Sequence, residues 1–169
     1  MDAGSIEQAT FHLPVGTATF MLADIEPGRL RESASGALAV VVAHHYELLD
    51  EAISQHGGVR RQQDEEASVV AAFTRASDAV AAALDVQRAV QAESQPDRTS
   101  VKLRIGLHTA EAQRRDEGDY FGHAVNPCAR LRAIAHGGQV VLSRTARDLV
   151  LDRLPEHAEL TDLGVHRLR

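Results

Sequence analysis

The chain has 169 residues, the usual size of one domain, and its 44% hydrophobic and 25% charged residues are ordinary for a soluble globular protein. No apolar run is long enough to span a bilayer, and the formal charge of -6 argues against a broad nucleic-acid interface, which needs clustered lysine and arginine. Cys128 is the only cysteine, which excludes an intrachain disulfide and a cysteine-based zinc site. We therefore expect a cytoplasmic protein with a single domain over residues 1–169, of which residues 1–12 form a loose N-terminal segment.

The first half of the chain predicts alternating strands and helices. Residues 15–25 are rich in valine, threonine and phenylalanine and predict a largely buried strand. Apolar residues then recur at helical spacing over residues 38–53, up to the tripeptide "HGG". A hairpin is expected next, with strands at 59–63 and 68–73 joined by an acidic turn. Ser77 is then expected to cap an alanine-rich helix.

The second half continues the pattern. In "VKLRIGLHT", residues 101–109, apolar and polar side chains alternate as in a half-buried strand. The other expected elements are a polar loop at 114–122, a helix at 124–134, a short strand at 139–143, a helix at 144–152 and terminal strand pieces at 158–164 and 165–169. This order favours an α+β sandwich with a mixed, mainly antiparallel sheet.

Asp24 is a first candidate site residue because it lies at the end of a strand that is predicted to be buried. A buried carboxylate is costly unless it is hydrogen-bonded, ion-paired or bound to a cation. The alternative is that Asp24 only caps the turn before the first helix.

A second candidate lies in "GDYFGHAVNPCARL", residues 118–131. Asn126 and Arg130 are four residues apart, so on a helix they share one face and can reach one ligand, and arginine is suited to phosphate oxygens. The alternative is that Asn126 is an N-cap followed by Pro127, with Arg130 as a solvated charge.

Several stretches of the chain, by their order and spacing together, resemble the catalytic domain of class III adenylyl and guanylyl cyclases, and bacterial members in particular. The resemblance covers almost the whole chain. The matching stretches are "FMLADIEPGRL", the "HGG" before the hairpin, "SVVAAFTRASDAVAAALDVQRAV", "LRIGLHTAEA", "GDYFGHAVNPCARLRAIAHGGQVVLS" and "TDLGVHRLR".

The resemblance implies a ferredoxin-like sandwich that works as a head-to-tail homodimer with nucleotide sites along the interface. It also implies two divalent ions, Mg²⁺ or Mn²⁺, held by two aspartates of one subunit, while the other subunit supplies asparagine and arginine. The implied reaction is attack of the ribose 3′-oxygen of ATP on the α-phosphate, with release of pyrophosphate.

By position in the family motifs, the resemblance implies a role for each of five residues. Asp24 matches the first metal aspartate, and Ile25 matches the adjacent carbonyl ligand. Asn126 matches the ribose-orienting asparagine, and Arg130 matches the transition-state arginine. Asp119 matches the acceptor of the adenine amino group, which favours ATP over GTP.

The remaining matched positions lie in two loops. Gly28 lies in the phosphate loop, where "DIEPGR" is one residue shorter than usual and Pro27 removes an N–H donor. Gln63 lies at the purine-reading position of the hairpin. Ala67 falls where the family has its second metal aspartate, and Glu66 replaces the preceding glycine.

Two hypotheses follow from these departures. In the first, the chain is a weak adenylyl cyclase in which Asp64, Glu65 or Glu66 partly substitutes for the missing aspartate. In the second, it is a non-catalytic module that dimerises with itself or with an intact cyclase and binds nucleotide without converting it.

Overall fold

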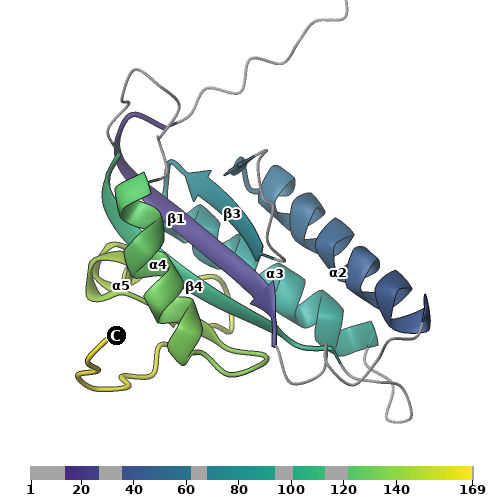
Figure 1. Ribbon diagram of the computed structural model, residues 1–169. Coiled ribbons are helices and arrows are strands. Elements are labelled where there is room, and N and C mark those ends of the chain that lie inside the picture. The colour runs from purple at the N-terminus through teal and green to yellow at the C-terminus, as the bar shows by residue number, and fades with distance from the viewer. Residues whose placement is uncertain (1–13, 27–35, 62–67, 94–100, 113–121, 169) are drawn as a thin grey trace, which may run out of the picture.

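The computed structural model describes residues 14–26, 36–61, 68–93, 101–112 and 122–168. Within them the chain forms five strands and four helices (Figure 1). Their bounds in chain order are β1 Gly16–Ile25, α2 Gly36–Gln55, β2 Val59–Arg60, β3 Ser68–Phe73, α3 Ala76–Glu93, β4 Leu103–Ala112, α4 Gly122–Ile134, β5 Val140–Leu142 and α5 Arg144–Val150. Among these residues, no helix has the length and apolarity that a membrane span requires.

One sheet joins all five strands in the order β2-β3-β1-β4-β5. The contacts of β1 with β3 and β4, and of β2 with β3, are antiparallel, whereas β4 and β5 are parallel. The sheet is therefore mixed and mainly antiparallel, and the hairpin of β2 and β3 is present, so both predictions are confirmed.

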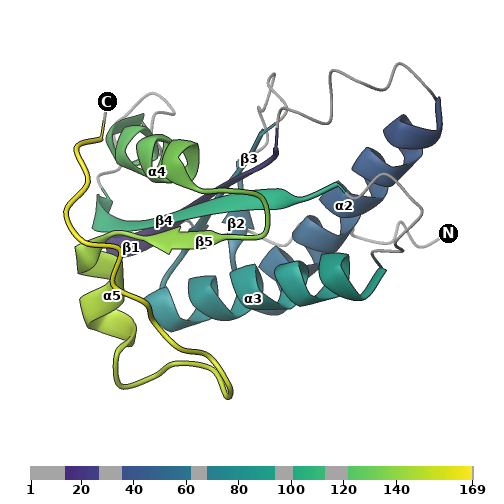
Figure 2. The ribbon, with the colours of Figure 1, turned by 90° about the horizontal axis from the view of Figure 1, so that it is seen from below.

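The two faces of the sheet bury different sets of side chains, because successive residues of a strand point to opposite sides. Met21 and Ile25 of β1 belong to the larger core, which includes side chains of α2 and α3. Phe20 and Leu22 belong to a second core with Ala124 and Cys128 of α4. Figure 2 shows the result, with α4 on one side of the sheet and α2 and α3 on the other.

Helix α4 packs unusually close to β4, and Gly106 makes this possible. A Cβ atom added at Gly106 would lie 2.6 Å from the carbonyl oxygen of Cys128 and 2.7 Å from the backbone nitrogen of Arg132. A side chain of any kind at this position would therefore push the helix away from the strand.

Three expectations from the sequence differ from the structure. Helix α3 begins at Ala76, so Ser77 lies inside the helix and is not its N-cap. Helix α4 begins at Gly122 and contains Pro127, so the interpretation of Asn126 as an N-cap is wrong. Residues 158–168 form no strand, which contradicts the expected terminal strand pieces within the part of the chain that the structure describes.

Candidate functional site

Asp24 is the penultimate residue of β1 and lies on the sheet face that α4 covers. It is 7% exposed, and in the antiparallel registers it lies directly opposite Arg104 of β4 and Ser68 of β3. Directly opposed residues of neighbouring strands project to the same face, so the backbone places an arginine beside the carboxylate.

Two guanidinium groups contact this carboxylate. Arg104 donates from Nε to Oδ1 at 3.0 Å and from Nη2 to Oδ2 at 2.6 Å, which is the paired geometry that suits arginine and a carboxylate. Arg132 of α4 donates from Nη1 to Oδ2. Both carboxylate oxygens thus accept charge-assisted hydrogen bonds. The expectation that a buried Asp24 has a partner is confirmed, and its partners among the described residues include two arginines.

Asn126 and Arg130 lie on α4, and both side chains are exposed. Their spacing of four residues places them on one face of the helix, as the sequence predicts. Arg132 is two positions further on, a rotation of about 200° about the helix axis. The face that carries Asn126 and Arg130 therefore points away from the face that carries Arg132 toward Asp24.

The floor between α4 and the sheet is apolar and closely packed. Cys128 is fully buried, and its thiol donates to the carbonyl oxygens of Gly106 at 2.9 Å and Phe20 at 3.4 Å. Burial raises the pKa of this thiol to about 12. His108 lies on the same sheet face, and partial burial lowers its pKa. Cys128 is therefore a core residue.

Ile25 completes β1, and its side chain is 2% exposed in the larger core. The other predicted site positions lie outside the residues that the structure describes. These positions are Gly28, Gln63, Asp64, Glu65, Glu66, Ala67 and Asp119.

The described residues around Asp24 do not fit a divalent cation as they stand. Magnesium requires several oxygen ligands in near-octahedral geometry, and both oxygens of Asp24 already accept hydrogen bonds from cations. Within the described ranges no group of three or more histidine, cysteine, aspartate or glutamate side chains is placed to hold a metal. Arg104 and Arg132 are thus the site residues that the sequence interpretation missed.

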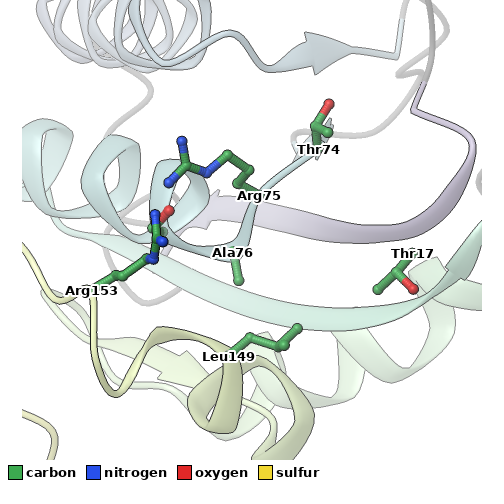
Figure 3. A pocket seen from close by; sticks show the side chains of 7 residues that line it. Thr17, Thr74, Arg75, Ala76, Leu149 and Arg153 are labelled. Atoms are coloured by element: carbon green, nitrogen blue, oxygen red, sulfur yellow. The ribbon is translucent and has the colours of Figure 1, made fainter.

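A pocket of about 420 Å³ lies elsewhere in the fold (Figure 3). Its lining includes Thr17 near the start of β1, Arg75 just before α3 and Ser77 in the first turn of α3. It also includes Leu149 of α5 and Arg153, which follows α5. Thr17 and Asp24 are seven residues apart on one strand, which is a separation of about 23 Å. This pocket is therefore separate from the Asp24 cluster.

The comparisons with known proteins identify the fold and the family. Residues 14–168 match the model of the adenylate and guanylate cyclase catalytic domain. A solved adenylate/guanylate cyclase/hydrolase from Silicibacter pomeroyi is 32% identical, with a TM-score of 0.73 over 89% of this chain and 87% of that one. An adenylate cyclase structure from Trypanosoma brucei, 23% identical, has the same fold, with a TM-score of 0.71 over 92% of this chain and 85% of that one.

Among curated proteins, an uncharacterised protein of Mycobacterium tuberculosis is 51% identical over 92% of this chain and 53% of its own length. A putative adenylate cyclase of Rhizobium meliloti is 28% identical over 77% of this chain and 22% of its own length. The chain thus spans about half or less of these relatives. The family match over residues 14–168, together with the shared fold, shows that this chain belongs to the class III adenylyl and guanylyl cyclase catalytic domains.

Proposed function

We propose that the chain is an adenylyl cyclase-type domain that binds ATP between two copies and converts it to cyclic AMP and pyrophosphate weakly or not at all. Domains of this family bind nucleotides, dimerise and use two metal ions. For this chain, the proposal adds that the nucleotide is ATP, that two copies pair head to tail and that the reaction is impaired.

The observation that supports a shared site is the orientation of α4. Asn126 and Arg130 are exposed on one face of this helix, whereas Arg132 on another face contacts the buried Asp24. One copy therefore cannot bring Asp24 and Arg130 to the same ligand. A second copy, placed head to tail, can supply Asn126 and Arg130 to the nucleotide that lies near Asp24 of the first.

The roles of the exposed pair follow from their chemistry. The Asn126 amide can hold the ribose, and the Arg130 guanidinium can stabilise the charge that develops on the phosphate oxygens as the 3′-oxygen bonds to the α-phosphorus and pyrophosphate leaves. Asp119 as an acceptor for the adenine amino group favours ATP over GTP. Gly28 and Gln63 are the further positions proposed to contact the nucleotide.

The impairment is proposed from Ala67 in the position of the second metal aspartate. A methyl group has no lone pair to offer a cation. Removal of a well-placed electrostatic group commonly costs a factor of about 10² to 10³ in rate, or roughly 3–4 kcal/mol. The retained Asn126 and Arg130 cannot replace that contribution, because they act on the nucleotide and not on a cation.

The second candidate function is a non-catalytic module that pairs with itself or with an intact cyclase. The observation that favours it is the pairing of both Asp24 oxygens with Arg104 and Arg132. A chain of this kind would still offer Asn126 and Arg130 to a partner whose own acids are complete. Its effect would then be regulatory.

The experiment that separates the candidates measures cyclic AMP formed from ATP by the purified chain with excess Mn²⁺. Asp24→Ala, Arg130→Ala and Ala67→Asp variants are assayed beside it, and calorimetry and sedimentation report ATP binding and dimerisation. Slow turnover that Arg130→Ala and Asp24→Ala abolish supports the weak enzyme. If none of the proteins forms cyclic AMP and the chain is a stable dimer that binds ATP, the non-catalytic module is supported. A monomer that binds no ATP contradicts both.

A further inference from the structure

We infer that Arg104 and Arg132 are the permanent counter-ions of Asp24, so that the chain's own guanidinium groups take the place of a divalent cation there. The inference deepens the proposed function, because it concerns the same site and rests on that assignment. Its test measures metal binding and unfolding rather than turnover, so either proposal can fail without the other.

The three groups come from segments far apart in the sequence, and the fold leaves them little freedom. Asp24 and Arg104 are directly paired positions of β1 and β4, so the strand register places their side chains on the same face of the sheet. Arg132 lies on α4, which the absence of a side chain at Gly106 allows to lie against β4. The side chains of Asp24, Arg104 and Arg132 are 10%, 13% and 23% exposed, so solvent does little to screen them.

The charge balance argues against an added cation. Within the described cluster of Asp24, Arg104 and Arg132, one carboxylate faces two guanidinium groups, which gives these three side chains a net charge of +1 at the position that the resemblance assigns to a divalent ion. A buried carboxylate needs compensation, and two charge-assisted partners provide it in full. A divalent ion at Asp24 would meet two guanidinium groups that already donate three hydrogen bonds to the carboxylate, which leaves it about one of its roughly four lone pairs.

The sequence departs from the family in a way that agrees with this balance. Where the resemblance implies a second acid, the chain has Ala67, so Asp24 is the one aspartate of that pair. The missing carboxylate and the two guanidinium groups close to Asp24 both lower the affinity of the site for cations. We therefore expect the fold of this chain to be indifferent to divalent metal.

The test uses the full chain and Mn²⁺ alone as the probe, with the bound fraction measured by electron paramagnetic resonance. The wild type and Asp24→Asn should bind Mn²⁺ equally weakly, and the urea midpoint of the wild type should be unchanged by EDTA or Mn²⁺. A ligand that binds the folded state would raise that midpoint by mass action. Saturable Mn²⁺ binding by the wild type that Asp24→Asn abolishes would overturn the inference.

A second set of variants tests the arginines directly. The double variant Ala67→Asp with Arg132→Gln should bind Mn²⁺ at least about tenfold more tightly than the wild type, because groups that contact a metal ligand commonly change affinity by about 10- to 100-fold. Adding Asp24→Asn should remove the gain. Arg144→Gln is the matched control, since the Arg144 side chain is 90% exposed on α5.

Unfolding measurements complete the test. Arg132→Gln should lower the urea midpoint clearly more than Arg144→Gln, and Arg132→Lys, which keeps the charge with fewer donors, should lie between them. Equal midpoints for Arg132→Gln and Arg144→Gln would show that Arg132 does not hold Asp24. If Arg132→Gln does not fold, Arg132→Lys and the wild-type metal titration still decide the matter.

Discussion

Replacing Gly106 by alanine adds one methyl group at the closest approach of α4 to the sheet. The new Cβ would lie 2.6 Å from the carbonyl oxygen of Cys128, 2.7 Å from the backbone nitrogen of Arg132 and 3.1 Å from its Cβ. The two nearest atoms belong to the helix backbone, so no side-chain rotation can relieve the contact. To reach the ordinary 3.4 Å, α4 must move by about 0.8 Å.

The loss of unfolding free energy in Gly106→Ala depends on the contacts that this movement of α4 disturbs. Extra methylene groups in a packed core cost about 1–3 kcal/mol, and the upper part of this range applies because the obstacle is backbone. The shift also lengthens the hydrogen bond from the Cys128 thiol to the Gly106 carbonyl, now 2.9 Å, and carries Arg132 away from Asp24. We therefore expect Gly106→Ala to lower the free energy of unfolding by about 2–3 kcal/mol.

Urea denaturation followed by circular dichroism measures this change, with Gly36→Ala as the matched control. Among the described residues, no heavy atom lies within 4 Å of a Cβ added at Gly36, so alanine there should be neutral or stabilising by up to about 1 kcal/mol. If Gly106→Ala were within about 0.5 kcal/mol of the wild type, the close packing of α4 on β4 would be refuted.

Three further predictions concern individual side chains. The hydrogen bond that His44 donates to Glu93, with a smaller contribution from Glu47, raises the pKa of His44 above 6.5. The stabilising contribution of this pair is therefore complete below pH 6.5 and is lost as the pH rises through the raised value. An NMR titration of His44 should show the raised pKa, and Glu93→Gln should lower it; an unchanged pKa in that variant contradicts the assignment. Cys128, whose pKa is about 12, should resist iodoacetamide at pH about 8 in the native protein and react in denaturant. Arg130→Ala should change the free energy of unfolding by less than about 0.5 kcal/mol, because the side chain is exposed, yet weaken ATP binding measured by calorimetry.

Much of the fold was predictable because the signals were local. Alternation of apolar and polar residues identified β4, and a run rich in valine, threonine and phenylalanine identified β1. The errors arose where tertiary contacts override a local rule. Proline is common at the first position of a helix, yet α4 continues through Pro127. The reason is that Ala124, Cys128 and Leu131 are buried on the same face of the helix on both sides of the proline.

The C-terminal stretch illustrates the opposite failure. Its spaced apolar residues, such as Leu160 and Leu163, suggest strands, but a strand forms only where a sheet edge accepts it. In the structure residues 158–168 form no ladder with the described strands, and Leu163 is 53% exposed. Sequence spacing alone contains no information on which edge is available.

The candidate site was predictable only in part. A buried acid at the end of β1 had to have a partner, and the sequence predicted that much for Asp24. The identity of the partners depends on long-range geometry. Arg104 is 80 residues away and is brought into place by strand register, and Arg132 is 108 residues away and depends on the absence of a side chain at Gly106.

The proposed defect in the cation site is tested most directly by the rate of cyclic AMP formation in two proteins, the wild type and the double variant Ala67→Asp with Arg132→Gln. Both are supplied with ATP and excess Mn²⁺. We expect a wild-type rate near background and a rate at least about 10² higher in the double variant, which has two acids and one fewer competing cation. Rapid turnover by the wild type, near the roughly 10 s⁻¹ of a typical enzyme and unchanged in the double variant, would contradict it.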